Sequence, residues 1–136
     1  MKPAVIDANI LLRFLLADHP QQSPRCRQLL LQVQEGTLEI FLPEAALSDV
    51  VWTLKSFYKW TNETIYQFVV SLLALNRLST TNKAHMQMAI TLFRNHNIDF
   101  SDALIAAQML NEGFEVIYTF DRDFNKITGI VRQEPT

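Results

Sequence analysis

The sequence has few of the residues that cross-links and flexible linkers need. Its 136 residues include one cysteine, Cys26, and 3 glycines. A single cysteine excludes an intramolecular disulfide and fits a reducing compartment, so we expect a cytoplasmic protein. No repeat, linker or low-complexity tract interrupts the chain, and 49% of its residues are hydrophobic. This composition predicts one globular domain over residues 1–136, with a substantial core.

The chain also lacks a net charge of one sign and a long apolar run. It has 12 basic and 14 acidic residues, so no sequence-wide basic field indicates a polyanion partner, although a local patch would suffice for nucleic acid. The apolar stretch 10–16 contains Arg13, and the chain has neither a signal-peptide core nor a membrane-spanning length. We therefore expect no membrane association. The 3 histidines share no metal-ligand spacing.

Short apolar strand patterns alternate with helix patterns along the chain. This order predicts an α/β fold in which βα units surround a mostly parallel sheet. The predicted strands are 4–7, 38–42, 78–80, 115–120 and 130–132. The predicted helices are 9–17, 23–35, 43–58, 63–75, 82–95 and one that begins at Asp99 or Ser101. Gly36 and Gly113 are expected to end helices, because glycine readily takes the left-handed conformation of a C-terminal cap.

Four aspartates stand at positions where an acid is locally unfavourable. Asp7 and Asp121 each end a predicted strand, Asp49 interrupts a helical segment, and Asp102 opens an apolar helix. In parallel α/β sheets ligands bind beyond the carboxyl ends of the strands, so these acids can converge there. Converging carboxylates repel each other unless a cation neutralises them. The pattern therefore predicts a divalent metal site.

Each acid also has a structural interpretation. Asp7 fits an N-cap for the helix that follows, a role compatible with metal binding. Asp49 could pair with a nearby arginine or lysine instead of a metal. Glu44 lies five residues earlier, about 140° around the same helix, and fits a charge in the first helical turn. Asp99, three residues before Asp102, fits an acid at a helix N-terminus.

Four further polar residues are close enough in sequence to support the metal-binding acids. Asn9 could orient Asp7 or bind a water molecule, with a local helix cap as its alternative. Thr119 could donate a hydrogen bond to a ligand carboxylate or a substrate phosphate. Asp99 and Asp123 are the other two candidates, and Asp123 has a loop ion pair or a turn as its alternative.

Four segments in this order, VIDANILLRFL, LSDVVWTL, DFSDALIAA and VIYTFDRDF, resemble the PIN-domain family and especially its VapC-type toxin ribonucleases. The resemblance spans almost the whole chain. It implies a Rossmann-like three-layer α/β/α sandwich and metal-dependent hydrolysis of RNA phosphodiester bonds. It also implies a cognate antitoxin and a homodimer. The implied ligands of Mg²⁺ or Mn²⁺, and the implied catalytic residues, are Asp7, Asp49, Asp102 and Asp121.

The chain departs from the family at one of these positions. The family usually has glutamate where this chain has Asp49, and aspartate is shorter by one methylene group. The shorter side chain predicts binding through a water molecule, and with it reduced activity or a changed metal preference.

Basic and aromatic side chains are candidate contacts for the implied partners. The basic ones could bind the RNA backbone or be solvated surface charges. They are Arg13, Lys55, Lys59, Arg122 and Lys126. The aromatic ones crowd one segment and indicate either a protein interface, such as one for an antitoxin, or a buried cluster. They are Trp52, Phe57, Tyr58 and Trp60.

Other functions remain open from the same residues. A non-catalytic PIN module that binds RNA or a protein is supported by Asp49 in place of glutamate. A phosphohydrolase like those of the haloacid-dehalogenase superfamily would use Asp7 as its nucleophile, but it would need an aspartate where this chain has Asn9. A phosphoacceptor receiver domain would need an acid after the second strand and a lysine after strand 115–120, and the chain has neither.

Overall fold

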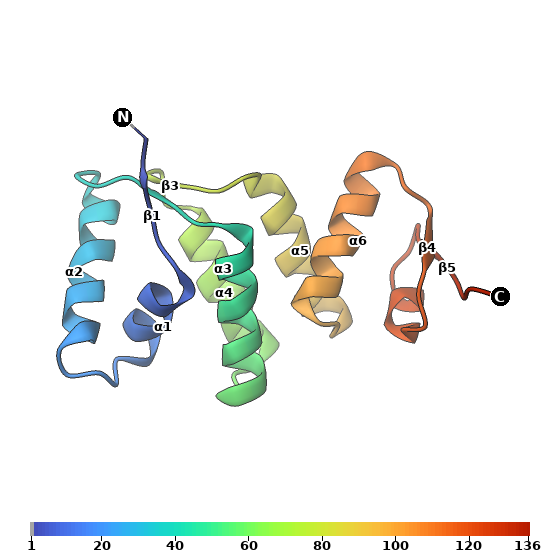
Figure 1. Ribbon diagram of the computed structural model, residues 1–136, viewed down its shortest axis with the longest axis horizontal. Coiled ribbons are helices and arrows are strands. Elements are labelled where there is room, and N and C mark those ends of the chain that lie inside the picture. Colours follow the sequence, from blue (N-terminus) through green and yellow to red (C-terminus); the bar gives the residue numbers. More distant parts are fainter. Residues whose placement is uncertain (1) are drawn as a thin grey trace.

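The computed structural model describes residues 2–136 as helices alternating with short strands (Figure 1). Every predicted strand and helix overlaps an observed one. The strands are β1 (Ala4–Val5), β2 (Ile40–Phe41), β3 (Leu78–Ser79), β4 (Val116–Tyr118) and β5 (Val131–Gln133). The α-helices are α1 (Ala8–Leu16), α2 (Gln22–Glu35), α3 (Glu44–Trp52), α4 (Asn62–Leu73), α5 (Lys83–His96) and α6 (Phe100–Glu112). In residues 2–136, no helix is both long and apolar enough to cross a bilayer.

Side-chain caps fix the starts of three helices. Asp7 caps α1, where its Oδ1 accepts a hydrogen bond from the Ile10 N–H at 3.3 Å. Thr61 caps α4 and Asn82 caps α5 in the same way. These caps satisfy backbone N–H groups that have no partner within the helix. Gly113 ends α6 with a φ of 81°, a left-handed conformation that lets the chain turn into β4.

Two segments differ from the predicted helices. The helix predicted over 43–58 is α-helical only to Trp52 and continues as the π-helical turn η1 (Thr53–Phe57). Leu54 within η1 is fully buried, so tertiary packing accompanies this wider turn, for which the sequence has no signal. A short 3₁₀ helix, η2 (Arg122–Lys126), lies between β4 and β5.

The predicted α/β class is confirmed, and every strand pair is parallel, but the strands form two sheets. One sheet has the order β1-β2-β3, with Val5 paired with Phe41, and the other consists of β4 and β5. Figure 1 shows β1 and β4 on opposite sides of the molecule, with α3, α5 and α6 between them. A single central sheet, as the strand pattern predicts, is therefore not present in residues 2–136.

The segment that joins β4 to β5 packs into the core, where Phe124, Ile127 and Ile130 are buried. Gly129 comes so close to α6 that a Cβ atom there would lie 3.2 Å from Leu110 Cδ2. Helix α6 in turn packs on α5 and contacts α3. Buried residues of β2, β3 and all six helices belong to one hydrophobic cluster, and Ile117 of β4 packs partly against it.

Candidate metal and RNA site

Asp7 and Asp49 line one open cavity of about 290 Å³, together with Asn9 and Thr53. Asp7 is placed there because it follows β1 and caps α1, and Asp49 because α3 packs against α1. Both carboxylates are exposed, as is Asn9. In residues 2–136 no arginine or lysine forms an ion pair with Asp49, so the structural pairing considered for it is not observed.

Asp102 and Asp121 form a second acidic pair. Asp102 lies in the first turn of α6, and Asp121 caps η2, where its Oδ1 accepts a hydrogen bond from the Asp123 N–H at 2.9 Å. The Thr119 hydroxyl accepts a hydrogen bond from the Asp121 N–H at 3.0 Å, which fixes the turn after β4. The negative charge of Asp121 acts on the Asp102 carboxyl group, so the two side chains are close.

The pKa of Asp102 is raised from 3.8 to about 6. Partial burial is the largest cause, because it disfavours the charged form. The negative charges of Asp121 and Asp99 act in the same direction, followed by the hydrogen bond with Asp121 and the charge of Asp123. Four carboxyl groups thus share one small region, and a cation there would relieve their repulsion.

This pKa predicts a pH dependence for the metal-free protein. A raised pKa means that ionised Asp102 disfavours folding, a cost absent below about pH 4 and fully present above about pH 6. The melting temperature of Asp102→Asn should therefore match that of the unsubstituted chain near pH 4 and exceed it increasingly up to pH 7. Calorimetric scans with a chelator measure this difference. A difference that does not change with pH would contradict the assignment.

The pair of Asp7 and Asp49 is separate from the pair of Asp102 and Asp121. In the part of the chain that the structure describes, no three Asp, Glu, His or Cys side chains are grouped closely enough to hold a metal ion. Asp99 lines a different cavity, between α3 and α6, together with Lys55. Asp123 forms an ion pair with Lys126 at 3.0 Å, the alternative considered for it.

The donor chemistry of both pairs suits a divalent cation. Carboxylate oxygens are hard ligands, and Mg²⁺ is usually bound by one or two carboxylates while it keeps several waters. The pKa of Asp102 is raised mainly by partial burial, and the negative charges of Asp121 and Asp99 raise it further. The side chains present therefore fit Mg²⁺ or Mn²⁺, although each pair supplies only part of the four-acid set.

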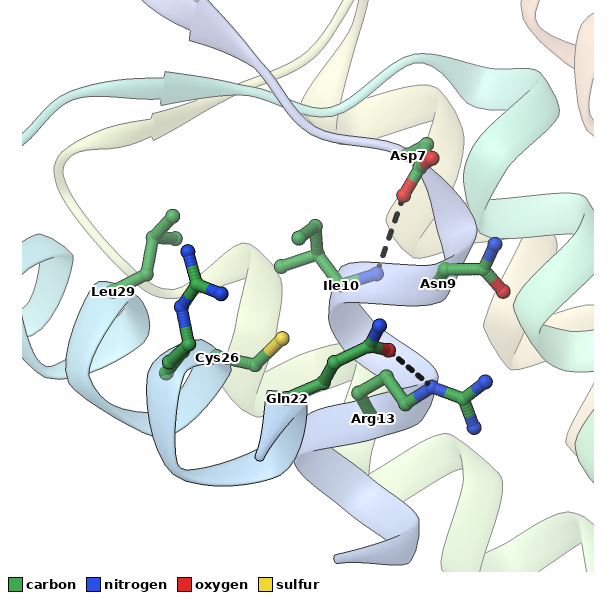
Figure 2. A pocket seen from close by; sticks show the side chains of 8 residues that line it. Asp7, Asn9, Ile10, Arg13, Gln22, Cys26 and Leu29 are labelled. Carbon is green, nitrogen blue, oxygen red and sulfur yellow. Dashed lines mark hydrogen bonds between the residues drawn. The ribbon is translucent and has the colours of Figure 1, made fainter. Parts of the chain in front are cut away.

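A larger cavity of about 480 Å³ adjoins Asp7 between α1 and α2 (Figure 2). Arg13 and Arg25 both line it, and Arg13 Nε donates a hydrogen bond to Gln22 Oε1 at 3.0 Å. Two guanidinium groups suit a phosphate of a nucleic-acid backbone. Arg25 was not among the basic candidates from the sequence, because its proximity to Asp7 depends on how α2 packs on α1.

The aromatic segment is a surface, which excludes a fully buried cluster. Trp52 and Phe57 are 65% and 71% exposed, and the ring centroids of Phe57 and Tyr58 are 4.9 Å apart. Trp60 alone packs partly against the core. Glu44 does not approach the acidic pairs, because it lies in the first turn of α3 and pairs with His85 Nε2 at 3.1 Å.

Comparison with known proteins shows to which of the considered protein families the chain belongs. The family model described as "PIN domain" matches residues 4–130, nearly the whole chain. The chain belongs to the PIN-domain family. It is also similar to a VapC ribonuclease of Aquifex aeolicus (strain VF5), with 25% identity over 123 residues, which cover 90% of each chain.

Family membership confirms the resemblance and the fold class. It excludes the two alternatives, a phosphohydrolase and a phosphoacceptor receiver domain, because each of these belongs to another family. The four predicted aspartates lie in two pairs, with Asp49 in the helix of the first pair. The two pairs lie on different sheets, Asp7 beyond β1 and Asp121 beyond β4.

Proposed function

We propose that this PIN-domain chain is a metal-dependent endoribonuclease, the toxin of a VapC-type toxin-antitoxin pair in the cytoplasm. The observation that carries the proposal is the raised pKa of Asp102, caused by partial burial and then by the charges of Asp121 and Asp99, within a PIN-family chain. The VapC ribonuclease of Aquifex aeolicus, similar over 90% of its length, supports the reaction type.

The residues that would hold Mg²⁺ or Mn²⁺ are Asp7, Asp49, Asp102 and Asp121. When bound, a divalent cation supplies Lewis-acid chemistry that lowers the pKa of water and neutralises charge on a phosphodiester group. Asn9 would orient Asp7 from within the same cavity. Thr119 would hold Asp121 in place through its backbone, since its hydroxyl accepts the Asp121 N–H.

The protein's own basic side chains would position the RNA. Arg13 and Arg25 face the cavity that adjoins Asp7 and would bind backbone phosphates, which carry no base information. Lys126 is less available, because it is paired with Asp123. This arrangement orients a phosphodiester bond toward the acids and leaves the choice of cleavage site to other contacts.

The aromatic surface formed by Trp52, Phe57 and Tyr58 would receive the antitoxin. Exposed aromatic side chains are enriched in protein interfaces, because they bury a large apolar area at a small cost in conformational entropy. The same chain would also form a homodimer.

Cleavage of RNA tests this function directly. The purified chain, freed of any antitoxin, is incubated with labelled tRNAs and rRNA fragments in Mg²⁺, in Mn²⁺ and in chelator. We expect discrete cuts that require the metal and disappear in the chelator. A folded chain that binds these RNAs in the presence of the metal but never cuts them would instead be the non-catalytic PIN module.

A further inference from the structure

The two sheets have four edge strands, β1 and β3 in one sheet and β4 and β5 in the other. Within residues 2–136, β1 pairs only with β2, and β4 pairs only with β5. Ala4 and Val5 of β1 are exposed, whereas Leu78 of the opposite edge strand β3 is buried. Uncovered strand edges carry unpaired N–H and C=O groups that readily accept another strand.

An apolar surface extends from the open edge of β4. Phe114, Val116, Tyr118 and Phe120 alternate along the chain and therefore project to one face of the strand. Val131 of β5 lies directly opposite Val116 and adds to this face. Tyr118 and Phe120 are 69% and 73% exposed. On the other face of this small sheet, Ile117 packs partly against the core, so only one of the two faces is covered.

A cavity lies directly beyond the end of β1. Asp7, two residues beyond β1, lines the cavity of about 480 Å³ between α1 and α2. Ile10, Cys26 and Leu29 contribute apolar side chains to it, as Figure 2 shows.

The total surface area is larger than expected for a monomer, as it would be if one interface with a second copy were uncovered. A folded monomer of 15.7 kDa is expected to expose about 7,300 Å², whereas this chain exposes 8273 Å². The excess, roughly 1,000 Å², is comparable to the ~800 Å² that each partner buries in a stable protein interface.

The two edges cannot meet within one chain without loss of buried contacts. They lie on opposite sides of the molecule, separated by α3, α5 and α6 (Figure 1). Helix α6 is held to α5 by fully buried Ala103, Ala106 and Ala107, and Phe93 and Phe100 meet edge to face. A second copy can supply β4 without disturbing any of these contacts.

We propose that two copies of this chain assemble reciprocally, with β4 of each copy pairing in parallel with β1 of the other. The contact is isologous and closes as a two-fold dimer. Each half then contains one five-stranded parallel sheet in the order β3-β2-β1-β4-β5, with its last two strands from the partner copy.

This assembly completes the acidic site, and in that respect it rests on the proposed function. Asp7 follows β1 and Asp121 follows β4, and neighbouring parallel strands are about 5 Å apart. Strand pairing therefore brings Asp7 and Asp49 of one copy beside Asp102 and Asp121 of the other copy, at the carboxyl ends of the paired strands. The four acids converge only between chains.

Molecular mass and cross-linking test the assembly without any activity measurement. Light scattering should show a dimer for the unsubstituted chain and a monomer for Val116→Lys. The matched control is Val70→Lys, at a side chain of α4 that is 37% exposed, and it should remain dimeric. In a Cys26→Ala chain carrying Val5→Cys and Tyr118→Cys, a short bismaleimide should link two chains. A monomer of the unsubstituted chain, a link within one chain, or a dimer that survives Val116→Lys would overturn the proposal.

Mixed dimers test the shared site. Asp7→Asn and Asp102→Asn chains, co-expressed with different tags and purified together, should regain roughly half of the unsubstituted activity, because one of the two sites is then intact. Each variant alone should be inactive. Mixed dimers that remain inactive while the unsubstituted protein cuts RNA would overturn the shared site. If no form cuts RNA but mass and cross-links agree, the assembly stands and the ribonuclease proposal fails.

Discussion

Asp102→Asn is expected to lower the rate of metal-dependent RNA cleavage by at least about 100-fold, the usual cost of removing one preorganised electrostatic group from an active site. Asp102 is the carboxyl group whose environment departs most from water, being partly buried beside Asp121, Asp99 and Asp123. Asparagine has nearly the same shape but cannot supply the negative charge that a metal needs. Initial cleavage rates at saturating Mg²⁺ measure the effect.

The same substitution should leave the fold intact. The amide removes a charge that disfavours folding above about pH 6, so the variant should melt at a higher temperature than the unsubstituted chain at pH 7. Glu35→Gln, at an exposed position near the end of α2, is the matched control and should change neither rate nor stability. Cleavage by Asp102→Asn within a few-fold of the unsubstituted rate would remove Asp102 from the site.

Leu11→Ala is expected to destabilise the protein by about 2–5 kcal/mol, since it removes a fully buried side chain and leaves a cavity. Leu11 lies in α1, which packs on both α2 and α3 and positions Asp7 and Asn9. A loss of this size is a large part of the 5–15 kcal/mol that typically stabilises a domain. Urea unfolding followed by circular dichroism gives the free energy of unfolding.

Leu31→Ala is the matched control for this core substitution. Leu31 belongs to neighbouring helix α2 and is 41% exposed, so its truncation should cost about 0.5 kcal/mol or less. Equal shifts of the urea midpoint in the two variants would contradict the central position that the structure gives Leu11.

Local signals in the sequence were sufficient for the elements and for the placement of the acids. Apolar runs that end in Asp7 and Asp121 predicted strands followed by ligands, and both residues do follow strands. Thr61 and Asn82 cap helices where hydroxyl and amide side chains precede helical patterns. Gly113 ends α6 in the left-handed conformation, which glycine adopts at lower cost than other residues.

The tertiary arrangement could not be predicted from local signals in the sequence. The pattern of alternating strands and helices does not specify which strands pair, and the division into two sheets depends on how β4 and β5 pack on α6. The π-helical turn at Thr53–Phe57 has no sequence signature. Arg25 reaches the cavity beside Asp7 only because α2 folds back along α1.

The position of Asp49 illustrates the limit of a single-residue argument. Aspartate within an apolar helical stretch suggested a compensating partner, yet the side chain is exposed and lines a cavity with Asp7. Its distance from the second acidic pair depends on the placement of α6, a property of the assembled fold. The family's usual glutamate would reach further by one methylene group from the same helix.

Mn²⁺ titration by calorimetry tests most directly the central claim that acids from both sheets share a metal. The unsubstituted chain should bind Mn²⁺ at pH 7, and Asp7→Asn and Asp102→Asn should each abolish that binding although they alter different pairs. Glu35→Gln should bind as the unsubstituted chain does. Unchanged Mn²⁺ affinity in either aspartate variant would contradict the shared site and leave two unrelated acidic pairs.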